Sequence, residues 1–195
     1  MKRKILYMYH TSTIGGGSYC LLNILKELDK DKYTPIVLLL QDGPLVKAID
    51  VLGIKVYFMP LMRLVPYNET TTLPKIRNAI QLISSFRQFR QLIREISPDI
   101  VYVNTMMMYP YLRIAKEEGT KTIIHVREHW PVNEHKWQRK TAINHIIKFA
   151  DQIIAINSFS ASMVENSKKN VTVVYDWIDM SSRYEELPYS EMLGE

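Results

Sequence analysis

A cluster of ionisable side chains directly follows a short apolar run in the second half of the chain. His125, Arg127 and Glu128 come just after Ile123 and Ile124, and the apolar run is typical of a buried strand. An imidazole, a fixed cation and a carboxylate together offer hydrogen-bond donors and acceptors to a polar ligand. We interpret the cluster as a functional site into which His125 points. The alternative is a polar loop that carries one core histidine.

The same segment contains the spacing His125-x-x-Glu128-His129, which matches a zinc-protease pattern. That pattern needs a helix to bring both histidines onto one face. The β-branched residues before the cluster favour a strand, and Pro131 prevents a helix from continuing through it. We therefore expect no metal at this site.

A second candidate is the glycine-rich stretch Thr11 to Ser18, which lies between an apolar run and an amphipathic segment. Its glycines, Gly15, Gly16 and Gly17, let backbone N–H groups approach a phosphate closely, and Ser18 is a plausible N-cap for the helix that follows. The spacing is not G-x-G-x-x-G, and the lysine of a P-loop is absent. A flexible turn is the alternative interpretation.

These candidates need a scaffold, and the chain alternates strand-like and helix-like segments almost from end to end. We expect strands at 4–9, 35–40, 54–59, 100–104, 121–126, 152–156 and 171–175, and helices at 18–28, 44–52, 73–96, 111–118, 136–149 and 158–168. This order predicts an α/β fold, a Rossmann-like parallel sheet with helices on both faces. Ligands of such sheets bind beyond the carboxyl ends of the strands.

Several polar residues follow the expected strands and therefore belong to the candidate site. They are His10, Asn104, Thr105 and Tyr109. The methionines between Thr105 and Tyr109 either line an adaptable pocket or pack in the core.

The expected helix 73–96 carries isoleucines and phenylalanines at spacings of three and four, with Arg87, Arg90 and Arg94 on a neighbouring stripe. The preceding segment, Leu61 to Tyr67, is unusually apolar for a loop. Basic amphipathic helices can lie on anionic membranes, so these three arginines are candidate membrane contacts. The alternative is that the apolar stripe packs on the sheet while the arginines are solvated.

Bulk composition places limits on the function. The 195 residues are 23% charged with a net charge of +5, which is too weakly basic to indicate nucleic-acid binding but allows an anionic partner. Cys20 is the only cysteine, so no intrachain disulfide can form. We find no signal peptide and no apolar run long enough to span a membrane. We expect a cytoplasmic protein, and the basic helix allows a peripheral location at the inner face of the membrane.

Five segments appear along the chain in an order that resembles that of a known family. They are the glycine-rich loop, Ser97 to Asn104, His125, Ala150 to Asn157, and Val173 to Asp179. Together they resemble the N-terminal domain of glycosyltransferase family 4, whose enzymes have the GT-B fold. The resemblance implies an N-terminal acceptor-side domain at 1–180, and a linker at 181–195 that leads to an absent C-terminal donor-binding domain.

The resemblance also implies a function and roles for individual residues. It implies retaining transfer from a UDP- or GDP-sugar, the co-substrate, to a polysaccharide or lipid-linked acceptor, without a further cofactor and without activity in this fragment alone. Gly15 to Ser18 would face the donor phosphates, and His125 would be catalytic. Sugar or acceptor contacts would come from His10, Asn104, Thr105, Tyr109, Arg127 and Glu128.

The sequence departs from the family pattern at one place and leaves two other functions open. Asp176-Trp177 replaces the Asn-Gly that the family often has, which puts a borrowed hinge role for these positions in doubt. The chain could instead be a stand-alone binding or scaffolding module. It could also be a dinucleotide-dependent oxidoreductase domain with Asp42 near the ribose, although the glycine spacing argues against that.

Overall fold

The computed structural model describes residues 2–63, 76–128, 130, 136–164 and 171–176. The described chain alternates strands and helices, as the sequence predicts. The strands are β1 (Arg3–Met8), β2 (Tyr33–Leu39), β3 (Lys55–Phe58), β4 (Ile100–Val103), β5 (Lys121–Val126), β6 (Gln152–Ala155) and β7 (Val171–Val173). The helices are α1 (Gly16–Glu27), α2 (Pro44–Asp50), α3 (Ile76–Ile96), α4 (Pro110–Glu117), α5 (Lys136–Phe149) and α6 (Ser158–Ser162), with a short 3-10 turn η1 (Met106–Met108).

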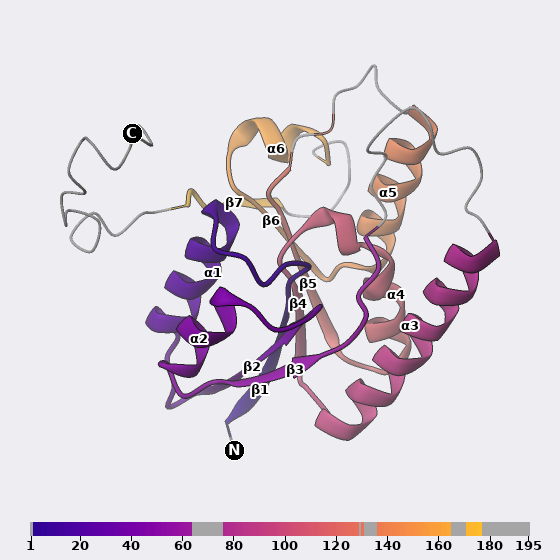
Figure 1. Ribbon diagram of the computed structural model, residues 1–195. Helices are drawn as coiled ribbons and strands as arrows, with labels where there is room; N and C mark the ends of the chain where they lie inside the picture. Colours follow the sequence, from indigo (N-terminus) through magenta and orange to yellow (C-terminus); the bar gives the residue numbers. More distant parts are fainter. Residues whose placement is uncertain (1, 64–75, 129, 131–135, 165–170, 177–195) are drawn as a thin grey trace, which may run out of the picture.

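The seven strands form one parallel sheet in the order β3-β2-β1-β4-β5-β6-β7 (Figure 1). The chain first winds from β1 outward to β3, then crosses back along α3 and continues from β4 to β7. The strand order therefore reverses between β1 and β4, which are hydrogen-bonded neighbours. In doubly wound sheets this reversal opens the ligand crevice at the carboxyl ends of the strands.

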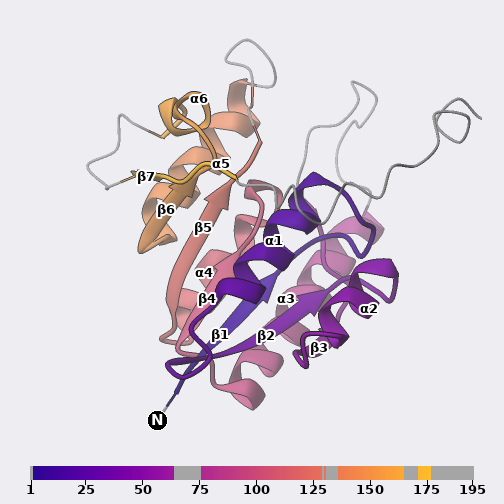
Figure 2. The same ribbon diagram turned by 90° about the vertical axis from the view of Figure 1, so that its left-hand side faces the viewer.

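Alternation along the strands divides the core into two layers. Ile5 and Tyr7 of β1 pack in the layer under α1 and α2, whereas Leu6 and Met8 pack in the layer under α3, α4 and α5. Figures 1 and 2 show these two groups of helices on opposite faces of the sheet. Central strands are buried on both faces, which explains their nearly continuous apolar sequence. The predicted fold class is confirmed.

Helix α3 follows its predicted apolar stripe over only part of its length. Phe89, Ile93 and Ile96 are buried, but Ile80 and Ile83 are 62% and 52% exposed. The spacing of apolar residues defines one face of a helix, yet it does not show how far the opposing layer extends. The alternative in which the apolar stripe packs on the sheet therefore does not hold for Ile80 and Ile83.

Most element boundaries agree with the sequence to within a few residues, and β5 and α5 have the predicted ends. The expected helix 158–168 ends at Ser162 within the described part. The apolar loop from position 64 onward and the linker 181–195 lie outside the described residues. Across the part of the chain that the structure describes, no helix is both long and apolar enough to cross a membrane.

Candidate functional site

Three polar residues lie at the edge of the sheet where three adjacent strands end. His10 follows β1, Asn104 follows β4, and His125 lies one residue before the end of β5. Each carries a buried polar atom without a hydrogen-bond partner among the described residues, namely His10 Nδ1, Asn104 Nδ2 and His125 Nε2. Buried polar atoms are normally paired, so this group indicates a site that a polar ligand completes.

His125 is held in a fixed position by its neighbours. The ring is 2% exposed, and its Nδ1 lies 2.8 Å from the hydroxyl of Tyr102 on β4. Burial, and secondarily the Arg127 cation, lower the pKa of His125 from 6.5 to about 4, against an opposing effect of Asp176. The imidazole is therefore neutral near pH 7.

Arg127 uses every nitrogen of its guanidinium on protein groups. Nε donates to Asn104 Oδ1 at 3.0 Å, and Nη1 donates to Asp176 Oδ2 at 2.5 Å. Nη2 lies 3.3 Å from His125 Nδ1, and the side chain is only 8% exposed. The guanidinium thus joins β4, β5 and the segment after β7, and a direct contact of Arg127 with the ligand stays a prediction.

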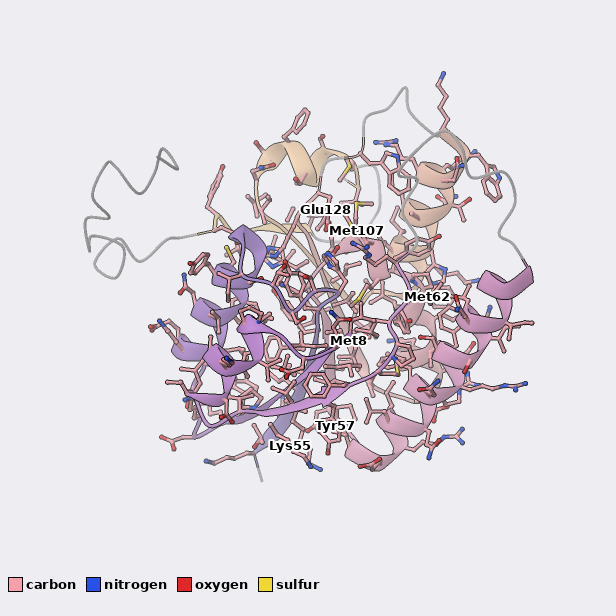
Figure 3. The ribbon with its side chains drawn as sticks, viewed as in Figure 1. Met8, Lys55, Tyr57, Met62, Met107 and Glu128 are labelled. Atoms are coloured by element: carbon pink, nitrogen blue, oxygen red, sulfur yellow. The ribbon has the colours of Figure 1, made fainter. Side chains whose placement is uncertain are left out.

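Glu128 is also engaged by the protein. Its carboxylate accepts hydrogen bonds from the Thr105 hydroxyl and from the Met106 N–H at 3.0 Å. Thr105 in turn caps η1 by accepting from Met107 N. Figure 3 shows Glu128 and Met107 beyond Met8, the last residue of β1. The Thr105 and Glu128 side chains therefore fix the turn after β4, and their contact with a ligand stays a prediction.

The glycine-rich loop leads directly into α1, which begins at Gly16 with Gly15 as its N-cap. The prediction of Ser18 as N-cap was wrong, because Ser18 lies inside the helix and its hydroxyl donates to the Thr13 carbonyl at 2.6 Å. A Cβ on Gly17 would lie 2.5 Å from the Tyr9 hydroxyl oxygen, whereas a Cβ on Gly15 or Gly16 would meet nothing within 4 Å. Packing against the Tyr9 side chain therefore favours glycine at position 17, and there is open space at positions 15 and 16.

Tyr109 and His10, two predicted ligand contacts, both pack against aromatic side chains. The Tyr109 ring packs edge-on against His145 of α5, with 5.2 Å between the ring centroids. Met106 and Met108 are buried in the core, which favours the packing interpretation of these methionines. His10 stacks edge-on against Tyr9, and burial together with the Arg63 cation lowers the pKa of His10 from 6.5 to about 4.

Two residues of the site escaped the sequence analysis. Tyr102 could have been found from strand alternation, which places it two positions before Asn104 on the same face of its strand. Asp176 was noted only as a departure from a family pattern, although its charge complements that of Arg127. His125 lies in β5 and not in the helix that the zinc-protease pattern needs, and His129 is outside the described residues.

The arginine stripe on α3 is partly neutralised by α4. Arg90 pairs with Glu117 at 2.5 Å and with Glu118 at 3.0 Å, and Arg94 pairs with Glu118 at 2.7 Å. Arg87 is exposed. Membrane contact stays a prediction that now depends on Arg87 and the exposed isoleucines more than on Arg90 and Arg94.

Comparison with solved structures places the fold among GT-B glycosyltransferases. HepE from Anabaena, solved with UDP and glucose, has a TM-score of 0.68 at 21% identity, over 92% of this chain and 46% of HepE. MurG from Acinetobacter baumannii has a TM-score of 0.59 at 13% identity, over 89% and 45% of the two chains. WaaB, a lipopolysaccharide outer core galactosyltransferase, has a TM-score of 0.62 at 19% identity, over 90% and 46%.

The chain thus spans about half the length of each of these proteins. A comparison with curated protein sequences found no match. The model of glycosyltransferase family 4 matches residues 14–182, which is most of the chain; the matched range contains Gly15 to Gly17, the end of β4 and the His125 cluster. The chain therefore belongs to glycosyltransferase family 4.

Proposed function

We propose that this chain is the acceptor-side half of a retaining glycosyltransferase that uses a nucleotide-sugar donor, a UDP- or GDP-hexose. Family membership supports the transferase activity. HepE, the similar structure solved with UDP and glucose, supports the donor class. The acceptor would be a growing polysaccharide or a lipid-linked glycan, and this half would be inactive alone.

The observation that carries the proposal is the group of unpartnered polar atoms on His10, Asn104 and His125 at the reversal point of the sheet. The N-terminus of α1 follows the loop after β1, and its first turn contains no acidic residue. The first N–H groups of a helix have no partner within the helix and favour an anion. Open space at Gly15 and Gly16 gives a phosphate access to these groups.

Glycosyl transfer breaks the bond between the anomeric carbon and a phosphate oxygen and forms a bond from that carbon to the acceptor oxygen. The acceptor hydroxyl proton passes to the departing diphosphate, which otherwise leaves with the negative charge. Hydrogen-bond donors placed where this charge grows lower the barrier. The loop Gly15 to Ser18 would act on the diphosphate through its backbone, and His125 would act beside the sugar.

The location that we propose is cytoplasmic, at the inner face of a membrane that holds the acceptor. Ile80 and Ile83 on α3 are exposed next to Arg87, a combination suited to an anionic lipid surface. Sedimentation with anionic liposomes tests this. Binding that weakens at high salt is expected, and no binding at either salt would refute the membrane contact.

The proposed activity is tested with the polypeptide that the full reading frame encodes. A panel of UDP- and GDP-hexoses is offered with lipid-linked and polysaccharide acceptors, and product formation and anomeric configuration are followed by NMR. Transfer with the donor's anomeric configuration retained is the expected result. An inverted product would refute the retaining mechanism, and no transfer from any nucleotide sugar would refute the donor class.

A further inference from the structure

Arg127 donates hydrogen bonds to acceptor atoms of two residues, Asn104 and His125. An arginine side chain has only donors, so any atom that it hydrogen-bonds must accept. Its Nε lies 3.0 Å from Asn104 Oδ1, and its Nη2 lies 3.3 Å from His125 Nδ1. The Asn104 amide is therefore oriented with its oxygen toward the guanidinium.

The same reasoning fixes the tautomer of His125. Nδ1 faces a donor-only group, so it carries the lone pair, and the single proton of the neutral ring is on Nε2. The Tyr102 hydroxyl, 2.8 Å from Nδ1, can donate to the same lone pair. The two atoms left without a partner among the described residues are Asn104 Nδ2 and His125 Nε2, and both are then donors.

We propose that Arg127 is a positioning residue that sets the hydrogen-bond polarity of the site. By taking the acceptor atoms of Asn104 and His125, it leaves three N–H bonds, two on Asn104 Nδ2 and one on His125 Nε2, for a ligand that presents oxygen lone pairs. Both side chains are at least 98% buried, so bulk water cannot satisfy these donors when the ligand does not.

The arrangement of donors has two consequences. The first concerns the ligand, and the class of ligand named here rests on the proposed function. The ligand atoms here are sugar or phosphate oxygens that accept, and a group that can only donate is rejected because it leaves buried donors unpaired. His125 also cannot act as a general base in its resting state, since Nε2 already carries the proton and Nδ1 is occupied. It acts as a hydrogen-bond donor.

Asp176 completes the arrangement from the far side of Arg127. It accepts from Nη1 at 2.5 Å, which aligns the guanidinium so that Nε and Nη2 reach Asn104 and His125. The segment after β7 is thereby connected to the His125 ring through one side chain.

The test is the tautomer of His125, read from long-range proton–nitrogen NMR correlations of the ¹⁵N-labelled 195-residue chain at pH 7. The wild type is expected to show the Nε2–H pattern. In the double variant Arg127→Met/Asp176→Asn, which leaves no unpaired carboxylate, the pattern shifts toward Nδ1–H as that nitrogen becomes free to donate to Tyr102. Asp176→Asn alone keeps the Nε2–H pattern.

Tyr102→Phe separates the two groups that face Nδ1. It keeps the Nε2–H pattern if Arg127 sets the tautomer, and loses it if Tyr102 does. Three results overturn the proposal: an Nδ1–H or doubly protonated ring in the wild type, an unchanged double variant, or a shift in Tyr102→Phe. None of these measurements uses a sugar donor, so they stand or fail separately from the transfer assays.

Discussion

Arg127 and Asp176 form an ion pair of 2.5 Å that joins the end of β5 to the segment following β7. The arginine is 8% exposed and the aspartate 30%, so water screens this pair less than the surface pairs of the chain. The pair ties the last described segment of the domain to the strand that carries His125.

Asp176→Asn is expected to lower the free energy of unfolding by about 1–2 kcal/mol, because it leaves the Arg127 charge largely buried and less well compensated. Urea denaturation monitored by circular dichroism measures the change. Lys32→Gln removes the exposed pair with Asp29 and serves as the control, with no measurable loss of stability expected because solvent screens this pair. Equal effects of the two variants would argue against a special role for the pair.

The glycine-rich loop predicts opposite outcomes at adjacent positions. Gly17→Ala should destabilise the fold by about 1–3 kcal/mol, since the new Cβ would meet the Tyr9 hydroxyl, and adding Tyr9→Phe should recover part of the loss. Gly16→Ala should leave thermal stability unchanged but weaken UDP binding about tenfold or more, because the methyl group enters the space before the N-terminus of α1. Calorimetric titration of the full-length enzyme with UDP provides the binding constants. Unaltered UDP affinity in Gly16→Ala would remove the loop from the donor site.

Stability should depend on pH through three histidines that are partly or fully buried. The pKa values of His10, His125 and His145 are lowered from 6.5 to about 4, chiefly by burial. As the pH falls below 6.5, the unfolded chain takes up protons that the folded chain does not. The free energy of unfolding therefore decreases, by at most about 1.4 kcal/mol per pH unit for each histidine.

Urea denaturation between pH 7 and 5 measures this slope, in a window above the range where paired carboxyls such as Glu118, whose pKa is lowered, begin to titrate. His145→Gln should reduce the slope of the free energy of unfolding against pH by the contribution of one of the three histidines. A slope near zero in the wild type would contradict the lowered pKa values.

Asn104→Asp tests the donor polarity of the site directly. The new carboxylate keeps the shape of the side chain and can still accept from Arg127, but it replaces an N–H donor with an acceptor. We expect kcat/KM of the full-length enzyme to fall at least about tenfold, the effect of one lost hydrogen bond plus repulsion. Wild-type kcat/KM in this variant would show that Asn104 does not donate to the substrate.

The sequence was a good guide to the sheet because the order of strands and helices is a local property. Apolar runs such as Ile123-Ile124 and the run that forms β1 identified the strands, and parallel topology then brought the loops after β1, β4 and β5 to one edge. His125 and Asn104 were found in this way.

The sequence was a poorer guide to which atoms remain available to a ligand. Arg127 and Glu128 were expected to face the ligand, but partners as distant in sequence as Asp176 and Thr105 occupy them. Pairing of this kind depends on distances between side chains from different strands, which periodicity does not encode. The sequence left the exposure of Ile80 open for a similar reason, since it depends on where the opposing layer ends.

The most direct test of the central claim is the turnover of His125→Ala in the full-length enzyme, with His145→Gln as a control at another histidine whose pKa is lowered to about 4. If His125 donates a hydrogen bond beside the reacting sugar, its removal should lower kcat about 10²–10³-fold, and His125→Gln, whose amide can donate, should recover part of the loss. His145→Gln should stay within about twofold of wild type, a change below the cost of one lost hydrogen bond. A kcat for His125→Ala equal to that of the wild type would contradict the assignment of this site.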